Sequence, residues 1–326
     1  MQKTDKWLSR YGIEAQNLPF TPGKVFFVFN SDDTAYQDFR AVHDGDQGGE
    51  ERVFTSINDA YDAAVSNRND IIVLNCHGGH AVNTAGLVIT KNRVHFMGLD
   101  IQGGRHYGST ARITGAATVT EVGIVHNTGV GNTFRNLKFD SGSTVEASIY
   151  AVAEGGEYSL YENCEFYKST DLDVTGSAEL LLNGDSAKFK DCTFGSLVNA
   201  ISGAIIRPCV TLTSGLISGK ACRDSMFENC LFWRNAGNVA NRFVYSGGAA
   251  SPERMLLFKD CVFLAARLST ATPAEVIGGA ASLTDGQILL ANCSAFNVTK
   301  WSTLTGVLGS MPTADVSMDT VGVQAA

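Results

Sequence analysis

The chain has 326 residues, a net charge of -8 and 44% hydrophobic residues. The acidic balance gives no reason to expect a nucleic-acid partner, and no run reaches the roughly 20 apolar residues that a membrane-spanning helix needs. A content of 34 glycines and only 6 prolines fits a turn-rich β protein.

Residues 1–24 are predicted to form an extended arm outside the main core. The stretch Leu18–Lys24 contains two prolines, and proline moves its predecessor out of the helical region. The arm combines basic and aromatic side chains, which we expect to anchor it on a partner or a neighbouring subunit. The expected contact residues are Lys3, Lys6, Trp7, Arg10, Tyr11 and Phe20. The first residues contain no apolar segment of the kind that directs secretion.

Residues 25–86 are predicted to cap one end of a β structure. Val25–Phe29 and Ile71–Leu74 are apolar runs typical of buried strands, and residues 30–51 are expected to form a polar loop. Ser56 followed by Asp59 resembles the capping box of a helix. An apolar stripe at helical spacing follows: Ile57, Ala60, Tyr61 and Ala64. Such a helix would cover exposed strand edges and core at the open end.

From residue 87, short strands alternate with turns and a six-residue phrase recurs. Its pattern is aromatic, charged, Asn or Asp, Cys, any residue, Phe. Copies begin at Phe134, Tyr161, Phe189, Phe227 and Phe258, and a worn copy begins at Leu290. Counted from Leu137 through the cysteines, the copies lie 27, 28, 38, 31 and 32 residues apart. A period of this length predicts a solenoid.

Each copy has one or two companion strands, so we predict an all-β, right-handed parallel β-helix with an N-terminal arm and a capping α-helix. Its rungs should span residues 87–300, and residues 301–326 should form a C-terminal cap or tail.

The phrase also predicts two ladders of stacked side chains. One comprises free, buried thiols, which suits a reducing compartment: Cys164, Cys192, Cys230, Cys261 and Cys293. The other should stack near a turn and bond to local backbone: Asn163, Asp191, Asn229, Asp260 and Asn292.

Carboxylates that could support catalysis are few. Glycoside hydrolysis needs two carboxylates across the scissile bond. Asp171 and Asp173 would share one face of an extended segment, and Asp185 lies in the next turn. Such aspartates are common in polar loops, so we interpret them as solvated turn residues and assign no catalytic residue.

Two further groups have residue types that suit binding. Cys76–His80 contains metal-ligand types, but its spacing matches no standard zinc site, so we predict a turn and neither metal nor cofactor. Tyr158, Tyr161 and Tyr167 can stack on sugars, although core packing explains most of them equally well.

Four segments of the opening resemble the start of right-handed parallel β-helix proteins encoded by tailed bacteriophages. They are Pro19–Val28, Asp38–Arg40, Arg52–Ala60 and Arg68–Leu74. Those openings share a Pro-Gly-Lys strand, an aromatic-Thr-x-Ile-x-x-Ala helix and an Arg-x-Asp-x-Ile strand. The later rungs are similar to the pectate-lyase-like superfamily in general. The resemblance to the phage proteins implies a virion structural role, often as a capsid decoration or cement protein.

We therefore expect a non-enzymatic virion protein, made in the host bacterial cytoplasm and placed on the capsid surface. Its expected partners are the major capsid protein and two further copies of itself in a homotrimer, with no nucleic acid and no membrane. The alternatives are a tail-associated β-helix, either a fibre or a polysaccharide-degrading tailspike, and a free polysaccharide lyase.

Overall fold

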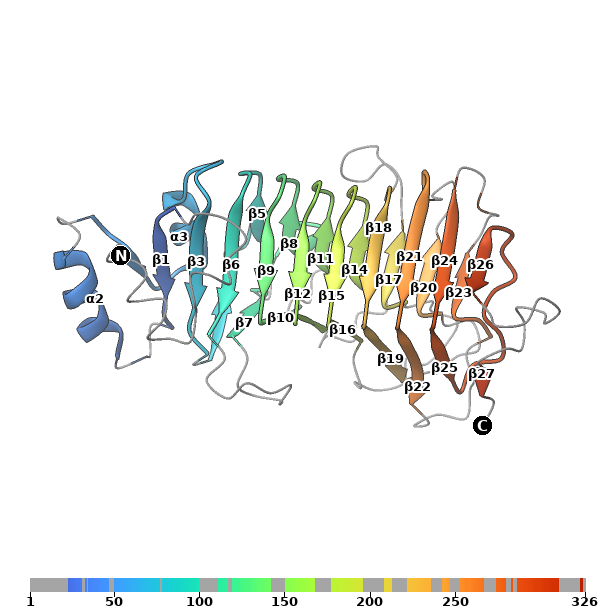
Figure 1. The fold of residues 1–326 in the computed structure, drawn as a ribbon. Helices are drawn as coiled ribbons and strands as arrows, with labels where there is room; N and C mark the ends of the chain where they lie inside the picture. The colour runs from blue at the N-terminus through green and yellow to red at the C-terminus, as the bar shows by residue number, and fades with distance from the viewer. Residues whose placement is uncertain are drawn as a thin grey trace.

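Three parallel sheets, A, B and C, wind around one core in the computed structural model, which confirms the predicted right-handed parallel β-helix (Figure 1). Each full rung passes from sheet A to B to C and then into sheet A of the next rung. The structure describes residues 23–30, 33, 35–46, 50–76, 78–99, 111–116, 119–141, 150–167, 177–195, 208–212, 222–235, 242–246, 252–266, 274–279, 283, 286–310 and 323–324.

Neighbouring strands within each sheet come from successive rungs. Sheet A contains, in order, β2 (Val53–Phe54), β1 (Val25–Val28), β3 (Asp70–Leu74), β6 (Val94–Gly98), β9 (Thr133–Arg135), β12 (Leu160–Glu162), β15 (Lys188–Lys190), β18 (Ser225–Glu228), β21 (Met255–Lys259), β24 (Gln287–Ala291) and β26 (Val307–Ser310). Sheet B contains β27 (Val323–Gln324), β25 (Ser294–Phe296), β22 (Val262–Ala266), β19 (Leu231–Asn235), β16 (Thr193–Phe194), β13 (Glu165–Tyr167), β10 (Leu137–Asp140), β7 (Ala111–Thr114) and β4 (Gly79–Ala81). Sheet C contains β23 (Ile277–Gly279), β20 (Val244–Ser246), β17 (Val210–Leu212), β14 (Ala178–Leu182), β11 (Tyr150–Glu154), β8 (Gly123–Asn127) and β5 (Leu87–Ile89).

Two columns of stacked rings fill the core. Consecutive ring centroids in the sheet A column lie 4.5–5.2 Å apart: Phe96, Phe134, Tyr161, Phe189, Phe227 and Phe258. Those in the sheet B column lie 4.4–5.1 Å apart: Phe139, Phe166, Phe194, Phe232 and Phe263. The first and last aromatic positions of the repeated phrase supply most of these rings. Because each buried ring contributes about 1.5–3 kcal/mol, the phrase supplies much of the stability of the fold.

Helix α3 (Ile57–Ala63) caps the first rungs as predicted. The Ser56 hydroxyl accepts a hydrogen bond from the Asp59 amide at 3.3 Å. Ile57, Ala60 and Tyr61 join the same core as the rungs, so the helix covers that core at its N-terminal end.

Helix α2 (Ala35–Asp46) corrects the predicted polar loop at residues 30–51. Its Phe39 ring lies 4.8 Å from the rings of both Phe27 and Phe29, on the side of β1 away from the main core. Tyr36 and Phe39, three residues apart on α2, both pack on this second, smaller core and so stabilise the helix. Neither α2 nor α3 is long and apolar enough to cross a membrane.

The sheets continue beyond residue 300. Strand β26 extends sheet A, and β27 extends sheet B (Figure 1). The buried Trp301 packs edge-on against Phe263, with ring centroids 6.1 Å apart. The segment predicted as a cap or tail therefore adds strands to the solenoid.

Candidate functional site

The N-terminal segments of the described structure converge on one buried carboxylate, that of Asp70. It accepts hydrogen bonds from the Lys24 amide at 2.8 Å, the Val65 amide at 2.7 Å, and two guanidinium nitrogens of Arg68 at 2.6 Å each. A Cβ on Gly23 would lie 2.4 Å from both the Arg68 carbonyl oxygen and the Asp70 carboxylate, so only glycine fits there. The Pro-Gly-Lys and Arg-x-Asp motifs, over 40 residues apart, thus form one unit, the Asp70 knot.

The repeated phrase forms the corner between sheets A and B. Its Asn or Asp residue takes the left-handed conformation, with φ between 52° and 55°: Asn136, Asn163, Asp191, Asn229, Asp260 and Asn292. Asn and Asp tolerate this region better than other non-glycine residues. The backbone amides of the first five donate to a carbonyl of the next rung at 2.9–3.1 Å. We call this the Asn/Asp column.

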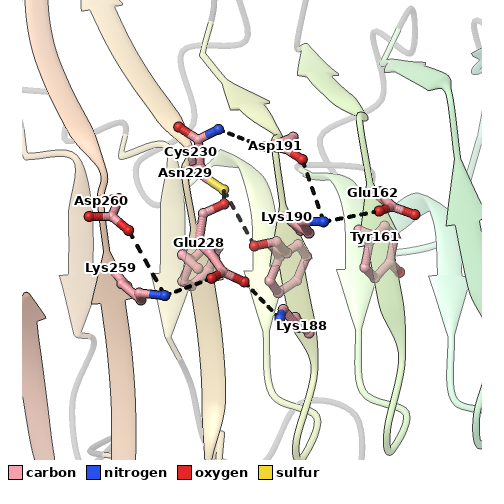
Figure 2. Close-up of polar contacts among 12 residues, drawn as sticks. Tyr161, Glu162, Lys188, Lys190, Asp191, Glu228, Asn229, Cys230, Lys259 and Asp260 are labelled. Carbon is pink, nitrogen blue, oxygen red and sulfur yellow. Dashed lines mark hydrogen bonds and ion pairs between the residues drawn. The ribbon is translucent and has the colours of Figure 1, made fainter.

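Side chains of the Asn/Asp column bond along the solenoid axis (Figure 2). The Asn229 amide donates to Asp191 at 2.5 Å, and Asn292 donates to Asp260 at 2.6 Å. Asn163 donates to Asn136 at 2.9 Å. These contacts give the Asn and Asp positions a structural reason.

The repeated cysteines lie beside this column as free thiols. Cys164, Cys192, Cys230 and Cys261 are buried, and Cys293 is half-buried. The Cys230 Sγ, for example, lies 3.5 Å from the Phe189 carbonyl oxygen of the preceding rung (Figure 2). Burial raises the pKa of the Cys192 and Cys230 thiols well above the usual value, so they are poor nucleophiles.

The outer face of sheet A carries a ladder of alternating charges (Figure 2). Glu162 pairs with Arg135 at 2.9 Å and with Lys190 at 3.5 Å. Glu228 pairs with Lys188 at 2.7 Å and with Lys259 at 2.9 Å, and these two lysines lower its pKa to about 2. Each glutamate thus pairs with a cation from both neighbouring rungs, and these ion pairs run along the solenoid axis.

A buried polar cluster surrounds Glu154 at the end of β11. Its carboxylate accepts hydrogen bonds from Asn127, the Gly156 amide, Ser159 and the Tyr161 hydroxyl at 2.5–3.2 Å. Burial raises the pKa of Glu154 to about 6, although its hydrogen-bond donors oppose the shift. Tyr161 therefore belongs to the core and cannot stack on a sugar.

A second buried cluster contains an ion pair that sequence reasoning missed. Arg234 on β19 donates to both carboxylate oxygens of Glu179 on β14, at 3.1 and 2.6 Å. Both side chains are at most 5% exposed, and the Cys209 thiol lies in the rung between them. Burial raises the pKa of Cys209 to about 12, which disfavours a reactive thiolate. The two charges are 55 positions apart in the sequence, so they leave no local sequence signal.

The residues weighed for catalysis or metal binding do not form one site among the described residues. Asp171, Asp173 and His77 lie outside that part of the chain. Asp185 is half-buried and accepts the Arg223 backbone amide at 3.2 Å, while the buried His80 Nε2 lies 2.9 Å from the Asn75 carbonyl oxygen. No group of three His, Cys, Asp or Glu side chains suited to a metal occurs in the described ranges.

The predicted contact residues of the arm cannot be placed. Lys3, Lys6, Trp7, Arg10, Tyr11 and Phe20 all lie outside the described residues. Their role in attachment stays a prediction.

The turns from sheet C into sheet A form a second left-handed column along the upper edge in Figure 1. Its members have φ between 51° and 69°: Asn67, Arg93, Gly131, Tyr158, Ser186 and Asp224. The first five amides donate to a carbonyl of the next rung at 2.6–2.9 Å, the same pattern as in the Asn/Asp column. We call this the mixed column.

Tyr158 is the exceptional member of the mixed column. Its side chain is 65% exposed, and a bulky residue in this backbone region costs about 1 kcal/mol or more. Of the three tyrosines considered for sugar stacking, Tyr161 is buried and Tyr167 is half-buried against the Lys138 ammonium, 4.5 Å from its ring. Only Tyr158 presents an open ring.

Solved structures of polysaccharide-acting proteins share this fold. A pectin methylesterase from Aspergillus niger is 14% identical with a TM-score of 0.55, and the match covers 94% of this chain and 91% of that one. The pectate lyase Pel9A is 10% identical, TM-score 0.57, over 94% and 83%. A rhamnogalacturonan lyase is 11% identical, TM-score 0.57, over 88% and 73%. No protein-family model matches the chain, and no curated protein matches it in sequence.

These likenesses show the fold, a right-handed parallel β-helix like that of the pectate lyase. They also correct the expectation of a non-enzymatic protein, because the solved neighbours named above are polysaccharide-acting enzymes. The absence of an evident carboxylate pair in the sequence was therefore too weak a reason to exclude catalysis. At 10–14% identity the likeness concerns the fold, and no link to a phage particle follows from it.

Proposed function

We propose that the protein is a virion surface protein of a tailed bacteriophage and decorates the capsid. The observation that supports this most is the Asp70 knot. The segments that resemble phage β-helix openings are separated in sequence, yet Gly23, Lys24 and Arg68 meet at one carboxylate. The α3 motif packs into the adjoining core, and Phe39 of α2 packs on β1. A chance match of short motifs would not be expected to build one cap.

In this proposal the arm at residues 1–24 attaches the solenoid to the major capsid protein, and three copies occupy a symmetry site. A cyclic trimer offers three equal arms and matches a three-fold axis. Light scattering of the purified chain should give three times the chain mass. A monomer at micromolar concentration would count against the trimer and would leave the capsid location to be tested separately.

Purified particles provide the direct test. Antibody against the solenoid, detected by electron microscopy, should label heads, and the chain should remain with heads after tails are sheared off. Labelling of tails alone would transfer support to the second candidate below. Absence of the chain from particles would refute the virion role.

The second candidate is a tail-associated β-helix that acts on polysaccharide. The likeness to pectin methylesterase and the lyases, together with the exposed Tyr158, favours it. Incubation with host capsule, lipopolysaccharide and polygalacturonate would then release reducing ends, unsaturated products or methanol. Loss of that turnover on replacing a single aspartate, such as Asp171 or Asp173, would identify the acid or base.

A further inference from the structure

The mixed column contains a surface notch that takes no part in core packing or in the proposed attachment to the capsid. Arg93, Gly131 and Tyr158 occupy the same position in three successive turns, each one rung apart. Strand spacing places the Cα atoms of Arg93 and Tyr158 about 10 Å apart. Gly131 has no side chain, so it forms the floor between them. We call this the Arg93–Tyr158 notch.

Few atoms of the described residues lie over Gly131. A Cβ built on Gly131 would meet one described atom within 4 Å, the Arg93 Cγ at 3.5 Å. The aliphatic stem of Arg93 therefore lies beside Gly131, and no described atom of Tyr158 lies within 4 Å of that Cβ position. Val130, which precedes the floor residue, is 36% exposed and adds an apolar margin. Arg93 is exposed, and no ion pair involves it among the described residues.

The left-handed backbone conformation of the turns does not explain why Arg93 and Tyr158 occupy these positions. All six members of the Asn/Asp column are Asn or Asp, although both columns make the same backbone hydrogen bonds. Arg and Tyr are poorly suited to the left-handed region and gain nothing there from the turn. An observed outlier of this kind, on the surface, is a reason to look for a ligand.

We propose that the Arg93–Tyr158 notch binds one pyranose ring of a glycan. The apolar face of the sugar would lie on the Tyr158 ring, and hydroxyl or carboxylate oxygens of the sugar would accept hydrogen bonds from the Arg93 guanidinium. A sugar ring is thin enough to fit between walls about 10 Å apart at the backbone. Tyrosine supplies rigid contact area, and arginine supplies a planar set of donors. This binding does not depend on where the protein sits in a particle.

Native gels cast with a polysaccharide measure such binding by retardation of the protein. The probes are two neutral polymers, dextran and galactomannan, and two acidic ones, polygalacturonate and hyaluronate. If a neutral polymer retards the protein, sugar hydroxyls are the groups that accept hydrogen bonds from Arg93. If only an acidic polymer retards it, the accepting group is a sugar carboxylate. Both results support the notch if the variants below behave as expected.

The test variants use asparagine, which the other column carries at the equivalent backbone position, so the fold should be retained. Tyr158→Asn removes the wall, and Gly131→Asn fills the floor; each should raise the apparent Kd by about tenfold or more. Tyr158→Phe keeps the ring and should bind nearly as well as the wild type. Asp224→Asn is the matched control, in the same column two rungs beyond Tyr158, and should bind unchanged.

Three results would overturn the proposal. One is no retardation of the wild type by any of the four polymers, and another is retardation that survives both Tyr158→Asn and Gly131→Asn. The third is an oligomer that either variant dissociates, because the notch would then be a subunit contact. Labelling of particle heads or tails is unaffected by any of these results, so failure of the notch and failure of the virion role can be distinguished.

Discussion

Tyr161→Phe isolates one hydrogen bond in the core. The Tyr161 ring stacks between Phe134 and Phe189, at centroid distances of 4.5 and 4.9 Å, in a column otherwise made of phenylalanines. Phenylalanine should therefore keep the packing and remove only the hydroxyl that donates to Glu154. A hydrogen bond to a charged group contributes about 1.5–3 kcal/mol, and one to a neutral group about 1 kcal/mol. We expect the free energy of unfolding of the variant at pH 8 to be about 2 kcal/mol lower than that of the wild type.

The cost of this change should depend on pH. Burial raises the pKa of Glu154 from 4.5 to about 6, so the native state holds this proton more tightly than the unfolded state. Protonation of Glu154 contributes roughly 2 kcal/mol to the free energy of unfolding. This contribution is fully present below about pH 4.5 and is lost as the pH rises through 6. At pH 4 the native Glu154 is neutral, and Tyr161→Phe should cost only about 1 kcal/mol.

Urea unfolding at pH 4 and pH 8, with Glu154→Gln as the background for a double-mutant cycle, measures both effects. In the Gln background the cost of Tyr161→Phe should be equal at the two pH values. An equal cost at both pH values in the wild-type background, or a variant more stable than wild type at pH 8, would show that the carboxylate is not charged in the core as we infer.

Three further predictions address the cap, the thiols and the arm. Asp70→Asn should lower the free energy of unfolding by about 3 kcal/mol, because it leaves the Arg68 guanidinium without its charged partner; the exposed Asp59→Asn is the control, and a loss below about 1 kcal/mol would contradict the role of the knot. Cys230→Ser should cost about 1–3 kcal/mol, because the shorter serine side chain loses packing and buries a hydroxyl whose nearest carbonyl acceptors already lie 3.4–3.5 Å from Sγ. The half-buried Cys76→Ser should change the unfolding midpoint little. Removal of residues 1–22 should leave the circular dichroism spectrum and melting unchanged, since this arm is predicted to lie outside the main core, but it should abolish binding to particles that lack the protein. Equal binding of the truncated chain would exclude the arm as the attachment device.

The fold class could be predicted because its signal is repeated. One phrase gives the aromatic columns, the buried thiols and the corner between sheets A and B, so each copy supports the same interpretation. The α3 cap was also readable, because Ser56, Ile57 and Ala60 show local capping and helical spacing. In these places the local pattern and the tertiary environment require the same residues.

Other features depend on contacts that no local pattern contains. Helix α2 forms where a loop was predicted because Phe39 packs against Phe27 and Phe29 on the outer side of β1. The pair Glu179–Arg234 joins two sheets across two rungs, and each residue alone reads as an ordinary charge on a strand. Such a pair is costly to bury, so sequence reasoning has no cause to place it in the core.

Comparison of the two left-handed columns shows which residue types the fold requires at its turns and which it only tolerates. Both make the same amide-to-carbonyl bonds between rungs, so the backbone geometry is satisfied without any particular side chain. In the Asn/Asp column the side chains add axial hydrogen bonds, and the residue type is uniform, which made it visible in the sequence. The mixed column includes Arg93 and Tyr158, which the turn does not favour, and its irregular membership concealed it. Uniform residues thus mark where this solenoid is held together, and the misfits Arg93 and Tyr158 mark the edge where a ligand is best sought.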